Sequence, residues 1–151
     1  EKLHIYIYIY MDIFFFYFIF IIYNMIINIF DLIIKSKKKL KLVIEDRKKF
    51  NGFEYGIENH AEIINFINKA DNDPWDVVLP GYKKKIDVNK NFKSNYIIGV
   101  LFLENNNSKI FMKVDHPGYS RTKAKRDIKK FIRNYHIKWK LKYCWIEYMG
   151  V

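Results

Sequence analysis

The densest group of side chains that could do chemistry is Asp71-Asn72-Asp73-Pro74-Trp75-Asp76, which places three carboxylates in one short segment. Hard divalent cations such as Mg²⁺ prefer oxygen ligands, and Mg²⁺ is usually held by one or two carboxylates together with substrate phosphates. Carboxylates this close repel one another unless a cation neutralises them. The segment is not a calcium-binding EF-hand loop, because Pro74 lies where that loop must bend. Two interpretations remain, a metal site and a solvated acidic turn.

Other side chains of catalytic type give weaker signals. His60 and His116 lie in loop-like contexts without a metal-spaced partner, which is typical of surface histidines. Cys144 is the single cysteine and stands beside Trp145 in an alternating segment, which favours core packing over a nucleophile. A single cysteine also excludes a disulfide framework and a multi-cysteine zinc site.

The segments that must position these residues are mostly strands. Short apolar or alternating runs predict strands at 40–45, 75–79, 96–103, 109–114 and 143–148. One apolar stripe predicts a helix, through Ala124, Ile128, Phe131, Ile132, Tyr135 and Trp139. Residues 57–70 are compatible with a short helix or an ordered loop. The order predicts an α+β, mainly β fold, namely a small OB-like, closed five-stranded β-barrel with the C-terminal amphipathic helix packed on it.

Composition divides the 151 residues into an apolar leader, 1–34, and a basic domain, 35–151. The leader contains four charged residues, Glu1, Lys2, Asp12 and Asp31, so the net charge of +11 becomes +13 for the domain. Residues 13–34 are long enough to cross a bilayer, and the lysines after them predict a signal anchor with the domain on the cytosolic side. The IYIYIY run at 5–10 equally favours a spurious N-terminal extension of a cytoplasmic protein.

Six segments along the domain resemble, in order and approximate spacing, the soluble family I inorganic pyrophosphatases. They are Asp46-Arg47, Tyr55-Gly56, DNDPWDVVLPG at 71–81, Ile98-Gly99-Val100-Leu101, Ser108-Lys109-Ile110 and DIKKFIRNYH at 127–136. The family has an acidic D-G-D-P-x-D signature and a helix that ends in Tyr-Lys. The resemblance covers roughly residues 40–150 and implies a five-stranded barrel, a Mg²⁺ cofactor and hydrolysis of pyrophosphate to two phosphates. It also permits a homo-oligomer.

The resemblance implies a role for each matching residue. Metal ligands would be Asp71, Asp76, Asp73 and Glu104. Asp73 would also orient or deprotonate the attacking water, with Arg47 and Lys109 completing the catalytic set. The phosphates of the substrate would contact Arg47, Tyr55, Lys109, Tyr135 and His136. These roles agree with metal-assisted hydrolysis, in which cations and phenols neutralise charge on the phosphate oxygens.

The sequence also departs from the family pattern. The acidic turn is shortened to Glu104-Asn105-Asn106-Asn107, so the neutral Asn107 stands where a carboxylate is expected, and His136 replaces a lysine. The Lys-x-Glu segment of the family has no counterpart among lysines 35–41. The leading hypothesis is therefore a divergent Mg²⁺-dependent pyrophosphatase. The alternatives are a catalytically impaired barrel that binds nucleic acid or another phosphate-rich partner, and a membrane-tethered pseudoenzyme.

Overall fold

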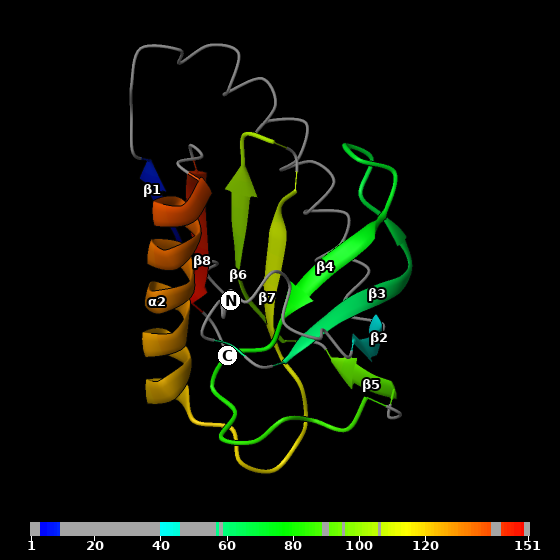
Figure 1. Ribbon diagram of the computed structural model, residues 1–151. Helices are drawn as coiled ribbons and strands as arrows, with labels where there is room; N and C mark the ends of the chain where they lie inside the picture. The colour runs from blue at the N-terminus through cyan, green and yellow to red at the C-terminus, as the bar shows by residue number, and fades with distance from the viewer. Residues whose placement is uncertain are drawn as a thin grey trace.

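The computed structural model describes residues 4–9, 40–45, 57, 59–88, 91–94, 96–105, 107–139 and 143–149. These residues form one sheet and one long helix (Figure 1). The strands are β1 His4–Ile9, β2 Leu40–Glu45, β3 His60–Ile67, β4 Pro74–Val78, β5 Asn91–Ser94, β6 Tyr96–Leu103, β7 Lys109–Lys113 and β8 Tyr143–Met149. The helix is α2, Arg121–Trp139.

The described strands are hydrogen-bonded in the order β1-β8-β6-β7-β4-β3-β2-β5. The pair β4/β7 is parallel, and the remaining neighbours are antiparallel. The mainly β class with a C-terminal helix is therefore confirmed. The described pairings do not show the predicted closed five-stranded barrel, because the strand order is open and ends at β1 and β5.

Most predicted elements are confirmed, including the helix and the strands at 96–103 and 109–114, which pair as the hairpin of β6 and β7. The expectation of a short helix or ordered loop at 57–70 is wrong for residues 60–67, which form β3. Ala61 and Ile63 point into the core with a period of two, and β3 pairs with a strand on each side. These long-range pairings outweigh the helix-like spacing of Ile57, Ala61 and Ile64, because β-branched residues fit a pleated sheet well.

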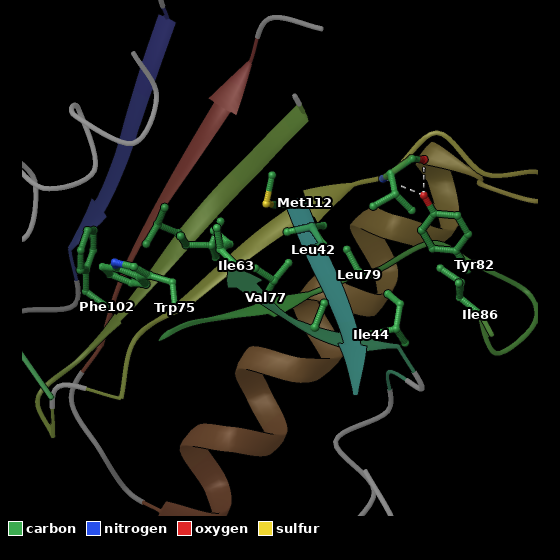
Figure 2. Close-up of a cluster of buried hydrophobic side chains, with 14 residues drawn as sticks. Leu42, Ile44, Ile63, Trp75, Val77, Leu79, Tyr82, Ile86, Phe102 and Met112 are labelled. Atoms are coloured by element: carbon green, nitrogen blue, oxygen red, sulfur yellow. Dashed lines mark hydrogen bonds between the residues drawn. The ribbon is translucent and has the colours of Figure 1, made fainter. Parts of the chain in front are cut away.

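One face of the sheet encloses the larger core cluster. Strands β2, β3, β4, β6 and β7 all contribute to it, and its members include Leu42, Ile63, Val77, Phe102 and Met112 (Figure 2). Trp75 is 1% exposed and belongs to this cluster together with Phe102 (Figure 2). Strands β2 and β6 share this core although β7, β4 and β3 lie between them in the sheet, so the sheet is strongly curved around it.

A buried tyrosine closes one end of this core. The Tyr82 hydroxyl donates a hydrogen bond to the Val114 carbonyl at 2.6 Å and accepts one from the Val114 N–H at 2.9 Å (Figure 2). Burial raises the pKa of Tyr82 to about 12. The phenol therefore stabilises the fold below its ordinary pKa of 10.0, and this contribution is lost as the pH rises toward 12.

We expect Tyr82→Phe to lower the free energy of unfolding by about 2 kcal/mol at pH 7, because both backbone groups of Val114 lose their partner in the core. The variant should also lose less stability than the wild type between pH 10 and 12. Urea unfolding at several pH values measures both effects. A variant as stable as the wild type at pH 7 would contradict this role for the hydroxyl.

The helix covers part of the opposite face of the sheet. Phe131 lies at the centre of this second core, with its ring centroid 5.3 Å from Phe111 and 5.5 Å from Tyr135. Ser120 caps the helix, because its hydroxyl accepts a hydrogen bond from Lys123 N–H at 3.3 Å. Gly81 has a φ of 91° and fits against the helix start, where an added Cβ would meet the Ser120 carbonyl at 2.8 Å.

The predicted leader is only partly described. Within it, β1 pairs antiparallel with β8 at the edge of the sheet, whereas the candidate anchor at 13–34 lies outside the described residues. Across the described ranges, none of the helices combines the length and the apolar character needed to span a bilayer.

Candidate metal centre

The acidic segment forms a tight loop between β3 and β4. Asn68 is 3% exposed and organises this loop, because its N–H donates to the Asp73 carbonyl at 2.8 Å and its side chain accepts from Ala70 N–H at 3.1 Å. The Asp71 carboxylate accepts a hydrogen bond from Asp73 N–H at 3.1 Å. Local hydrogen bonding of this kind is what Asp and Asn favour in turns.

Asn72 gives the loop its reversal of direction. It has a φ of 66°, and it is the one non-glycine residue with a positive φ in the described part of the chain. Asparagine tolerates this left-handed conformation better than most residues do. The conformation leaves Asp71 and Asp73 exposed on either side of it.

Asp71, Asp73 and Asp76 line one open pocket of about 470 Å³. The far side of the pocket comes from the turn between β6 and β7, through Asn105, Asn107 and Ser108. The two loops lie at the same end of the sheet, the upper end in Figure 1. The three carboxylates singled out by sequence therefore line the same pocket, and the shortened turn lies opposite them.

A buried cation lies against this pocket. Lys109, the first residue of β7, is 3% exposed, and its ammonium group donates hydrogen bonds to the Asp76 carboxylate and to the Asn107 side-chain oxygen. Asp76 and Lys109 lie on adjacent strands, since β4 pairs with β7. Lys109 therefore links β4, through Asp76, to the turn between β6 and β7, through Asn107.

Two further acids that sequence reasoning missed lie beside Asp76. Carboxylate oxygens of Glu45, Glu62 and Asp76 lie within 4.8 Å of one another. Glu62 is the direct partner of Asp76 in the β3/β4 register. Leu42 and Ile44 of β2 are buried in the core, so the alternation of a strand places Glu45 on the other face. The proximity of Glu45 to Glu62 and Asp76 depends on long-range strand register, which the sequence does not display.

Two of the remaining predicted site residues do not line the pocket, and the side chains of the other three lie outside the described part of the structure. Glu104 is exposed in the β6–β7 turn and is not among the residues that line the pocket. Tyr135 is 7% exposed and stacks on Phe131 in the second core. His136 belongs to α2, but its side chain lies outside the described part of the structure, as do Arg47 and Tyr55 entirely.

The side-chain atoms at this site that could bind a metal are all oxygens. Asp71, Asp73, Asp76 and the two neighbouring glutamates offer only carboxylate oxygens, and Asn105 and Asn107 add amide oxygens. Such a set suits Mg²⁺, Ca²⁺ or Mn²⁺ and does not suit soft metals that require thiolates. Because four carboxylates, those of Glu62, Asp71, Asp73 and Asp76, line the pocket and the Lys109 ammonium is already bound to Asp76, the group can hold divalent cations and would bind a polyanion together with them.

Comparisons of the chain with protein-family models, with curated proteins and with solved structures find no match.

Proposed function

We propose that this protein is a divergent Mg²⁺-dependent inorganic pyrophosphatase. The observation that carries the proposal is the convergence of Asp71, Asp73 and Asp76 on one open pocket, with Lys109 bound to Asp76. The motif resemblance requires these four residues to meet at a single site. A solvated acidic turn has no such requirement, and it would not need a buried lysine.

The strand order supports the finer part of the proposal, an OB-like barrel. Strands β2, β3, β4, β7 and β6 are consecutive neighbours, and the third and fourth of them are parallel. An OB-fold also combines a five-stranded Greek-key arrangement with a curved sheet around one core. The shared core of β2 and β6 supports closure of the same five strands.

Asp76 would hold Mg²⁺ together with Asp71 and Asp73, which line the same pocket. Among the described acids, the oxygens already close enough to share an ion are those of Glu45, Glu62 and Asp76. Bound Mg²⁺ would supply Lewis acidity toward water and toward the phosphate oxygens. This donor set fits the proposal, since Mg²⁺ prefers a few carboxylates and leaves other positions to water and to substrate phosphate.

The protein's own groups would then act on the substrate. Asp73 is exposed in the pocket, where its carboxylate can accept a proton from the attacking water. Lys109 can stabilise negative charge that develops on a phosphate oxygen, because a buried ammonium acts there with little screening by water. Roles for Arg47, Tyr55 and His136 in contacting phosphate belong to the same proposal.

The neutral turn suggests that metal binding is weaker than a fully acidic pocket would give. We expect Asn107→Asp to raise the apparent affinity for Mg²⁺ about tenfold, because affinity depends on the number of charged ligands. The Mg²⁺ concentration that gives half-maximal phosphate release measures this apparent affinity. Asn105→Asp is the matched control, since its carboxylate can still accept the hydrogen bond from Asn107 N–H. Equal gains in both variants would show a general charge effect and no special place for position 107.

The proposed function is tested by phosphate release from pyrophosphate with the purified full chain. We expect release with millimolar Mg²⁺ and none above background with EDTA. Absence of magnesium-dependent release, in a protein that binds Mn²⁺ in the pocket, would support the catalytically impaired binding protein instead. Absence of both would remove the metal-site interpretation.

A further inference from the structure

The exposed face of α2 is strongly basic. Among the side chains of α2 that the structure describes, six are exposed and positively charged, namely Arg121, Lys125, Arg126, Lys129, Lys130 and Arg133. Asp127, the single acid in the helix, is buried, where it accepts a hydrogen bond from Gly81 N–H at 2.9 Å and pairs with Lys123 at 2.6 Å. We call the six residues the basic face.

The basic face does not serve the stability of the helix. Residues four apart are neighbours on a helix surface, and like charges at this spacing destabilise it. Four such pairs follow from the sequence of α2: Arg121–Lys125, Lys125–Lys129, Lys129–Arg133 and Arg126–Lys130. The acidic side chain that could compensate them, Asp127, is already used on the inner side.

A neighbouring loop adds positive charge near the start of α2. The Gly81 carbonyl accepts a hydrogen bond from Ser120 N–H at 2.9 Å, so the loop after β4 lies beside the start of α2. This loop exposes Lys83, Lys84 and Lys85. Two exposed acids, Asp87 and Asp115, lie on loops and not on the helix.

The apolar side of α2 is already used. Ala124, Ile128, Phe131 and Tyr135 are buried against the sheet, so the side chains described for residues 121–135 leave no free apolar face to insert into a lipid surface. Among the side chains described for residues 121–135 of α2, the aromatic ones, Phe131 and Tyr135, are buried, so none of them is exposed for an unpaired base to stack on. Charge therefore is the means of recognition that the face provides.

We propose that the basic face binds the phosphate backbone of a double-stranded nucleic acid without reading its sequence. At 1.5 Å per residue the helix is roughly 28 Å long, a length of duplex axis over which each strand carries about eight phosphates. Successive basic residues of the row Arg121, Lys125, Lys129 and Arg133 rise about 6 Å each, so the row distributes positive charge along a duplex that carries about one phosphate per 1.7 Å of its axis. This activity is independent of the acidic pocket, which repels phosphate in the absence of divalent cations.

The test is binding of the full chain to a fluorescent DNA duplex of about two helical turns, in EDTA, over a series of salt concentrations. Lys125→Gln/Lys129→Gln removes two charges from the basic face. Lys41→Gln/Lys69→Gln removes two exposed lysines from β2 and from the loop after β3 and serves as the charge-matched control. Vesicles rich in phosphatidylserine and a single strand of the same length provide the other probes.

We expect log K to fall with log salt with a slope of about −5 if the six residues each contact a phosphate. The helix variant should bind about tenfold more weakly and with a slope shallower by about 2, whereas the control should bind within twofold of the wild type. The unfolding temperature of the helix variant should not fall. Equal losses in the two variants, stronger binding to vesicles or to the single strand, or no binding to the duplex at low salt would each overturn the proposal.

Discussion

Asp73→Asn should lower the rate of magnesium-dependent pyrophosphate hydrolysis by about 10²–10⁴-fold, the usual contribution of a positioned general base. The carboxylate is exposed in the pocket, and the amide of Asn has the same shape. The loop should therefore keep its conformation, because its hydrogen bonds use the backbone of Asp73 and the side chain of Asp71. Steady-state phosphate release with saturating Mg²⁺ measures the effect.

The matched control for this prediction is Asp87→Asn. Asp87 is an exposed acid in the loop before β5 and does not line the pocket, so its variant should hydrolyse pyrophosphate at the wild-type rate. Unfolding curves of both variants should coincide with that of the wild type. Full activity of Asp73→Asn would remove Asp73 from the catalytic machinery.

Lys109→Met should lower the free energy of unfolding by about 3–5 kcal/mol in EDTA, the range measured when one partner of a buried ion pair is removed. The side chain of Lys109 is 4% exposed, and its loss leaves Asp76 beside Glu45 and Glu62 without the ammonium group. Part of the loss should return with millimolar Mg²⁺, because a cation that binds the folded state stabilises it by mass action. Denaturant unfolding with and without Mg²⁺ measures both effects.

Lys113→Met is the control on the same strand. Lys113 is half-buried with its ammonium 4.8 Å from the centroid of the Tyr119 ring, and this contact contributes about 0.5–1 kcal/mol. We expect a small loss that Mg²⁺ does not restore. If Lys109→Met were no less stable than Lys113→Met, the ion pair with Asp76 would not organise the pocket.

Local sequence patterns predicted most of the elements. The stripe from Ala124 to Trp139 defines α2, because apolar positions that keep a period of 3.6 residues over several turns are typical of an amphipathic helix. β5 was not predicted, since Asn91–Ser94 has no alternating pattern and is a strand through its pairing with β2. His60 was expected at the surface, whereas it is 6% exposed in β3, with its ring 6.4 Å from that of Phe131.

In the candidate site, too, local sequence predicts some features, and contacts between distant segments determine the others. Asp71, Asp73 and Asp76 are close in sequence, so one tight loop is enough to place them along the same pocket. The burial of Lys109 was not predictable from its strand, because Ile110, Met112 and Val114 define the core face and leave Lys109 on the other side. On that side, Phe111 packs against Phe131 of α2 and Lys109 pairs with Asp76. Both contacts join residues that are distant in sequence.

The location of bound metal tests the central claim most directly. Crystals grown with Mn²⁺ and a non-hydrolysable pyrophosphate analogue can be measured at the manganese absorption edge. The proposed function predicts an anomalous peak within coordinating distance of Asp71, Asp73 and Asp76, with the analogue bound beside it and near Lys109. A pocket without manganese, or manganese bound only at other acids of the surface, would contradict it.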